Sequence, residues 1–132
     1  MLKENNKIMF KILALIGTGS FIGGISRYLF GQFVHRYLPI VFPYGTLAVN
    51  IVGCFLIGAI LGLSDRGMVT PPWRFFLATG FCGGFTTFST FAYENISLLN
   101  DKEYFYMFLY TALSFVIGLA ATYIGIIITR LI

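Results

Sequence analysis

Apolar residues fill four long stretches of the chain, and short polar or proline-containing stretches separate them. The pattern predicts helices near residues 9–34, 43–63, 73–98 and 103–130, each long enough for the roughly 20 residues that a membrane-spanning helix needs. The connections read HRYLPIVFP, SDRGMVTPP and LLNDKE, with the proline and charged residues typical of turns. Connections this short make neighbouring helices antiparallel. The pattern therefore predicts an all-α integral membrane protein with a single four-helix domain over residues 1–132.

The composition agrees with a membrane location. Of the 132 residues, 58% are apolar and 11% are charged, and the mean hydropathy is +0.85. A soluble domain of this length would carry far more charge. The basic residues are scattered at segment ends, so membrane lipid is the expected partner and nucleic acid is not. Six basic residues lie on the same side of the membrane as the termini and three lie on the other, so the positive-inside rule favours cytoplasmic termini. The six are Lys3, Lys7, Lys11, Arg66, Arg74 and Arg130, and the three are Arg27, Arg36 and Lys102.

The third predicted helix contains an unusual stretch, GFCGGFTTFSTF, at residues 80–91. Glycines weaken a helix, and hydroxyl groups need partners that hydrocarbon cannot supply. One interpretation is a helix broken near the bilayer midplane, whose freed carbonyls can bind a cation. The other is an unbroken helix with a glycine-rich packing face. The spacing does not decide between them.

Phe88 and Phe91 lie three residues apart, on one face of a helix, and Phe85 continues the same spacing. Such aromatic stripes commonly pack in a core or face lipid. The electropositive edges of the rings could also stabilise a small anion along a pathway. Hydroxyl groups on Thr87 and Ser89 would supply further donors beside the rings.

Two further helices carry polar residues at membrane depth. Asn50 in the second helix either holds helices together through interhelical hydrogen bonds or is an uncharged donor that lines an anion path. In the fourth helix, Tyr110, Ser114 and Thr122 share one face with Gly118. This hydroxyl stripe fits either packing, through bonds to the helix backbone, or a polar track.

Two charged residues within the apolar segments are candidates for a vestibule that attracts anions. Arg27 follows the glycines of GGISRY, and Glu94 lies three residues after Phe91. For both, a side chain that reaches the membrane interface is the alternative.

Together, the motifs GGISRY, PYGTLAVNIVGCFLIG and GFCGGFTTFSTF resemble the Fluc (CrcB-type) fluoride channels. The resemblance runs through the whole chain and includes its length and helix count. It implies a fluoride-selective passive ion channel that exports cytoplasmic fluoride and relieves fluoride toxicity. It also implies a multi-pass protein of the cell inner (plasma) membrane, assembled as an antiparallel dual-topology homodimer with a structural sodium ion at the dimer centre. Dual insertion calls for a nearly neutral distribution of lysine and arginine, from which the six-against-three count departs.

The resemblance carries roles to particular residues. Gly83 and Thr86 would offer the sodium-binding backbone carbonyls, and Phe88 and Phe91 the ring-edge fluoride contacts. Gly118 stands in the fourth-helix track where the family has a hydroxyl residue. The other pathway positions are Asn50, Tyr110, Ser114 and Thr122.

Other functions fit the chain less well. A small four-helix proton-coupled multidrug exporter needs a titratable carboxylate in its cavity, and the first helix has none after Glu4. A non-transporting membrane assembly subunit fits the glycines but gives no reason for the hydroxyl cluster. With one histidine and two cysteines inside apolar segments, no metal set or enzyme site can be assembled.

Overall fold

The computed structural model describes residues 2–38 and 41–132, and within these ranges the chain forms helices and turns without any strand. Four helical spans are long and apolar enough to cross a membrane, which confirms the all-helical prediction. The third span consists of several consecutive elements. The elements are α1 (Leu2–Tyr37), α2 (Tyr44–Asp65), α3 (Pro71–Arg74), the π-helical η1 (Phe75–Cys82), α4 (Gly83–Phe85), α5 (Phe88–Asn100) and α6 (Tyr104–Arg130).

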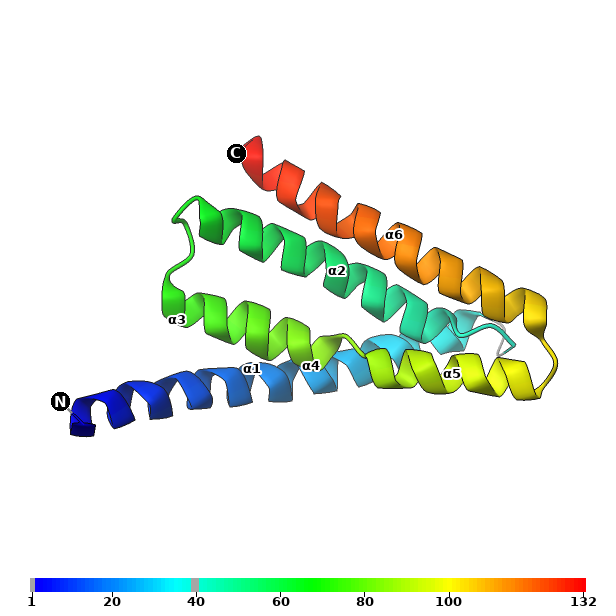
Figure 1. Cartoon of the computed structure of the whole chain (residues 1–132), viewed down its shortest axis with the longest axis horizontal. Coiled ribbons are helices and arrows are strands. Elements are labelled where there is room, and N and C mark those ends of the chain that lie inside the picture. The colour runs from blue at the N-terminus through cyan, green and yellow to red at the C-terminus, as the bar shows by residue number, and fades with distance from the viewer. Residues whose placement is uncertain (1, 39–40) are drawn as a thin grey trace.

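Consecutive spans run in opposite directions, so both termini lie at the same end of the molecule (Figure 1). The spans associate mainly as two pairs: α2 packs along α6, and α1 packs along η1 and α4. A hydrogen bond joins the turn after α2 to the end of the chain: the Arg66 guanidinium donates to the Thr129 carbonyl near the C-terminus of α6.

Glycines allow the close approach within each pair. A side chain at Gly58 on α2 would meet the backbone carbonyl of Thr122 on α6, and one at Gly23 on α1 would meet that of Phe81 on η1. Small residues at helix crossings let two backbones pack closely in lipid, where apolar side chains gain little by clustering. Many large apolar side chains are exposed, as expected for a surface that faces lipid.

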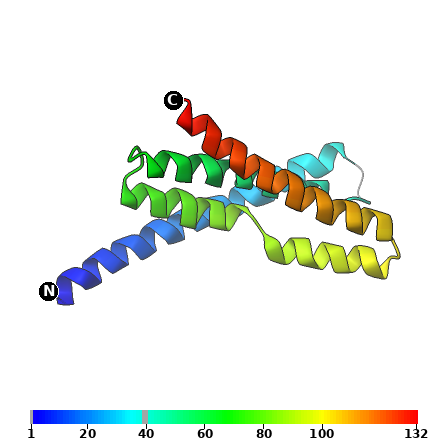
Figure 2. The same cartoon turned by 45° about the horizontal axis from the view of Figure 1, so that its top comes forward.

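The third span changes direction at two residues with extended backbone. Thr86 has φ −80° and ψ 158°, and Thr87 has φ −149° and ψ 117°. The helix resumes at Phe88, and Figure 2 shows α5 leaving the line of the preceding helix at this point. The Thr87 hydroxyl caps the new helix by accepting from the Thr90 amide at 3.3 Å. The local sequence supports this geometry, since glycines weaken the first half and a threonine caps the second.

Candidate functional site

A pocket of about 240 Å³ lies where α2, the junction of α4 and α5, and α6 meet. Most of the residues predicted to line an anion path border it, and none of its side chains carries a formal charge. Ser89, Tyr110 and Thr122 lie elsewhere. The lining comprises Asn50, Cys54, Thr86, Thr87, Phe88, Phe91, Ser114 and Phe115.

The Asn50 side chain is bound to the extended backbone of Thr87. Asn50 Nδ2 donates to the Thr87 carbonyl at 3.1 Å, and the Thr87 amide donates to Asn50 Oδ1 at 2.9 Å. These bonds satisfy backbone groups that the interrupted helix no longer pairs. The Asn50 amide nitrogen carries two N–H groups, so one remains for the pocket. Its position is therefore compatible with both interpretations from the sequence, an interhelical hydrogen-bonding role and a place in the pocket lining.

The hydroxyl groups after the junction form a local cluster. Besides capping α5, Thr87 Oγ1 lies 3.0 Å from Thr90 Oγ1, to which it donates, and 3.3 Å from Ser89 Oγ. Ser89 and Thr90 are exposed. Of this cluster, only Thr87 borders the pocket.

The three phenylalanines of the motif do not form one stripe. Phe85 precedes the junction and is buried against Phe30 and Phe81, so the expectation that it continues the face of Phe88 and Phe91 is wrong. The extended residues rotate the second half of the span relative to the first.

Phe88 and Phe91 both border the pocket, with ring centroids 5.7 Å apart. They differ in burial. Phe91 meets the Phe115 ring edge to face, with an interplanar angle of 85°, and also packs on Tyr110. Phe88 is 76% exposed at the rim. Phe91 therefore has a packing role in addition to any contact with an ion, whereas Phe88 has little packing within one chain.

The hydroxyl groups of α6 point in different directions. Tyr110, fully buried, donates to Glu94 Oε2 at 2.7 Å. Thr122 Oγ1 donates to the Gly118 carbonyl at 3.1 Å, within its own helix. Among the described residues, Ser114 Oγ is the buried side-chain polar atom without a hydrogen-bond partner, and Ser114 lines the pocket. An unpaired buried hydroxyl is costly, so this group is available to a polar species in the pocket.

Glu94 is held by two hydroxyl groups from neighbouring spans. Thr46 Oγ1 donates to Glu94 Oε1 at 2.7 Å, and the Tyr110 hydroxyl donates to the other carboxylate oxygen. Hydrogen bonds to a charged acceptor stabilise it away from bulk water. Glu94 also borders a second pocket of about 310 Å³.

Arg27 lines this second pocket, together with His35 and Glu94. Thr87 borders both pockets, which places the second one next to the uncharged pocket. Arg27 is partly buried, and its Nη1 lies 3.5 Å from the Thr86 carbonyl. Arg27 and Glu94, both predicted to lie in a vestibule, therefore meet at one polar pocket.

The backbone carbonyls of Gly83 and Thr86 lie at the junction. The Thr87 amide, which would reach back to the Gly83 carbonyl in a continuous helix, donates instead to Asn50. A side chain added at Gly83 would meet nothing within 4 Å, so this part of α4 lies on an open face. Carbonyl oxygens are hard ligands that suit hard cations, and the Thr86 carbonyl already accepts from Arg27. Among the described residues, no group of histidine, cysteine and acidic side chains could hold a metal.

Comparison with known proteins gives the same assignment as the motifs. The family model described as "CrcB-like protein, Camphor Resistance (CrcB)" matches residues 14–126. The chain belongs to the CrcB-like family. A protein of Chlorobium phaeobacteroides named "Fluoride-specific ion channel FluC" is 48% identical over 126 residues, covering 92% of this chain and 95% of its own. Proteins of the same name from Gloeothece citriformis and Flavobacterium psychrophilum are 43% and 44% identical, each covering 98% of its own length.

The region that matches the CrcB-like family contains every residue of the uncharged pocket. Sequence reasoning missed two of them, Cys54 and Phe115, and it missed the bond from Thr46 to Glu94. A signal for the α2 residues was present. Thr46, Asn50 and Cys54 are spaced four apart and so share one helix face. Phe115 gave no comparable signal, since it resembles the other apolar residues of its helix.

Proposed function

We propose that this protein is a fluoride-selective passive channel of the inner membrane that exports cytoplasmic fluoride. The supporting observation is the pocket at the junction, which offers uncharged donors and aromatic rings but no charged side chain. The naming of its relatives as fluoride-specific channels supports the same ion.

The chemistry of the pocket suits an anion that must shed its water. The free N–H of Asn50 and the unpaired hydroxyl of Ser114 can replace water as donors to fluoride. The edges of Phe88 and Phe91 supply positive electrostatic potential without a formal charge that would trap the ion. Fluoride would then bind strongly enough to enter the pocket and weakly enough to leave it. Larger halides accept longer and weaker hydrogen bonds from such donors than fluoride does, which is the proposed basis of selectivity.

The passive character follows from the same lining. The pocket contains no carboxylate, imidazole or amine that could couple transport to protons. Glu94 borders the adjacent pocket and is the carboxylate there that a proton-coupled exporter would need. Its two hydrogen bonds from Thr46 and Tyr110 give it a structural role that needs no proton transfer.

The proposal places the junction near the bilayer midplane. It divides the span Pro71–Asn100 near its centre, with residues 71–85 before it and residues 88–100 after it. Extended backbone at this depth is tolerated only where protein or a polar cavity surrounds it. Asn50 and the pocket meet that requirement.

The functional unit is proposed to be an antiparallel dual-topology homodimer. Phe88 is largely exposed at the pocket rim and Gly83 lies on an open face, so a second copy could complete the path there. A two-fold axis beside Gly83 and Thr86 would bring two carbonyls from each copy together. A sodium ion held by them would offset the partial negative charge of the Gly83 carbonyl, which the Thr87 amide no longer pairs, and would share the Thr86 carbonyl with Arg27.

Fluoride efflux from liposomes containing the purified protein tests the proposal. A fluoride gradient alone should drive efflux, and chloride at the same gradient should pass far more slowly. Equal flux of the two ions would refute selectivity. Fluoride movement that requires an imposed proton gradient would support the exporter instead.

A further inference from the structure

We propose that the Cys54 thiol lines the anion path and supplies the polar contact that α6 lacks at Gly118. The inference rests on the proposed channel function and concerns a pocket residue that the sequence pattern did not single out. It follows from the directions of the α6 hydroxyl groups and from the position of the Cys54 sulfur.

The polar stripe of α6 is discontinuous at the pocket. Tyr110 and Thr122 donate to partners outside it, as described above, and Gly118 has no side chain. Ser114 is the only member of the stripe that borders the pocket. An ion that moves past Ser114 along α6 would therefore find no further side-chain donor on this helix at Gly118.

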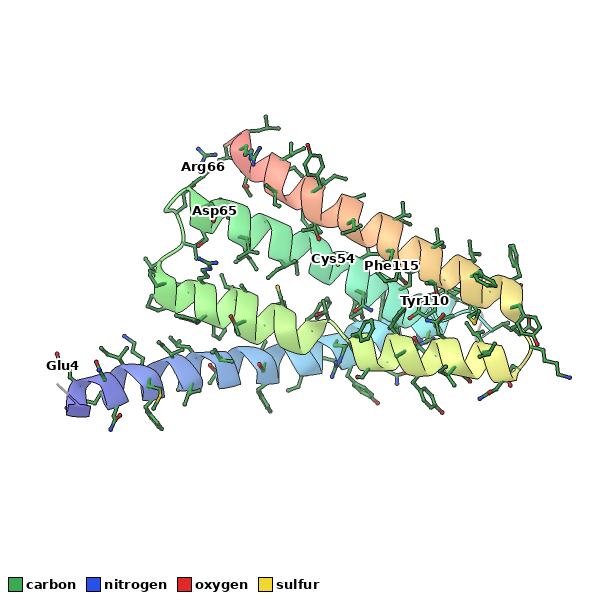
Figure 3. All side chains as sticks on the ribbon, viewed as in Figure 1. Glu4, Cys54, Asp65, Arg66, Tyr110 and Phe115 are labelled. Carbon is green, nitrogen blue, oxygen red and sulfur yellow. The ribbon has the colours of Figure 1, made fainter. Side chains whose placement is uncertain are left out.

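Cys54 occupies the space opposite Gly118. Its sulfur lies 3.5 Å from the position that a Cβ on Gly118 would take, which is ordinary van der Waals contact. Cys54 also borders the pocket together with Asn50, one helical turn earlier on α2, and with Phe115 on α6. Figure 3 shows Cys54 and Phe115 at neighbouring levels of their two helices.

A thiol is chemically suited to this place. It is a weak S–H donor with a polarizable sulfur, and it is small enough to leave the pocket open. Its S–H group would give the ion a contact beyond the buried hydroxyl of Ser114, for which the described residues offer no hydrogen-bond partner. Asn50, Ser114 and Cys54 would then form a row of uncharged donors from two helices.

Thiol modification tests the position of Cys54. Methyl methanethiosulfonate converts a thiol to a methyl disulfide: the cysteine sulfur bonds to the methylthio group, methanesulfinate leaves and the thiol proton passes to the buffer. Applied to the reconstituted protein, the reagent should abolish most of the fluoride flux and add one methylthio group to Cys54, detected by mass spectrometry.

Two cysteine variants serve as comparisons. Cys82 is buried and does not border the pocket, so Cys82→Ala should conduct like the unmodified protein and remain sensitive to the reagent. Cys54→Ala should conduct less and lose its sensitivity. Full flux after modification of Cys54, or no modification of Cys54 in the folded protein, would overturn the inference. If the unmodified protein carries no fluoride, the proposed function fails instead.

A rescue variant tests the role of the thiol as a donor. Cys54→Ala should lower fluoride flux roughly twofold to tenfold, the equivalent of one hydrogen bond. Adding Gly118→Ser to this variant places a hydroxyl in the vacated space and should restore much of the flux, whereas Gly118→Ala should not. Equal flux in the two double variants would show that Cys54 only fills space. Thermal unfolding of each variant in detergent checks that the fold is retained.

Discussion

Asn50 and Thr87 form a closed pair of hydrogen bonds, one in each direction, between a side chain of α2 and the extended backbone of the third span. A single side chain thus replaces two partners that a continuous helix would have supplied. Changes at Asn50 should therefore alter the backbone at the junction as well as the pocket wall.

Replacing Asn50 with aspartate should nearly abolish fluoride flux. The carboxylate keeps an acceptor for the Thr87 amide but loses the donor to the Thr87 carbonyl, and its charge repels an anion in the pocket. Asn95→Asp is a matched control, because Asn95 bonds to the Phe91 backbone carbonyl and to Thr111 and does not itself border the pocket. Comparable flux in the two variants, measured in liposomes, would contradict the role of Asn50.

Phe88→Ile should lower fluoride flux sharply without lowering thermal stability. Isoleucine keeps an apolar side chain but removes the ring edge, and the exposed Phe88 ring contributes little to packing within the chain. Phe10→Ile, at a ring that is 75% exposed on α1, controls for the loss of a surface aromatic residue. Unchanged flux in Phe88→Ile would return this ring to a packing role.

Phe91→Ile should lower both fluoride flux and stability. The Phe91 ring packs on Tyr110 and Phe115, so its removal leaves those contacts incomplete. The midpoint of thermal unfolding in detergent should fall clearly below that of Phe88→Ile. Equal midpoints for the two variants would show that the packing of Phe91 adds no stability.

Tyr110→Phe should mainly destabilise the protein, by about 1.5–3 kcal/mol, because it removes a buried donor to a charged carboxylate. Glu94 would keep only its bond from Thr46. Thermal or denaturant unfolding measures the loss. A large drop in fluoride flux with unchanged stability would instead support the direct pathway role that the family resemblance implies.

Gly83→Val should leave the fold of one chain intact and weaken the proposed dimer. A side chain at this position meets nothing within 4 Å in the chain, so a clash requires a second copy. Gly24→Val, also at an open position, is the control. Chemical cross-linking in sodium and in a larger monovalent cation would compare dimer content. A fully dimeric Gly83→Val protein would contradict the placement of the axis.

The hydrophobic pattern was sufficient to predict four helical spans, because span length depends on membrane thickness and little else. The pocket was partly predictable, since spacing identifies which residues share a helix face. Spacing cannot give the direction of a hydroxyl group. Thr122 turns to its own helix and Tyr110 to Glu94, and only Ser114 is left for the pocket. The direction of each hydroxyl group depends on which hydrogen-bond acceptors the neighbouring residues place beside it in the folded chain.

The junction at Thr86 and Thr87 has an electrostatic consequence for the whole span. A helix carries partial negative charge at its C-terminus and partial positive charge at its N-terminus. The helical residues 71–85 end at the junction and α5 begins there, so two poles of opposite sign lie within a few residues of each other. In the proposed channel, the carbonyl pole would favour a cation at Gly83 and Thr86, and the amide pole would favour an anion beside Phe88. A single interruption thus places two poles of opposite sign side by side, and the Arg27 guanidinium, with Nη1 3.5 Å from the Thr86 carbonyl, puts a positive charge at the carbonyl pole.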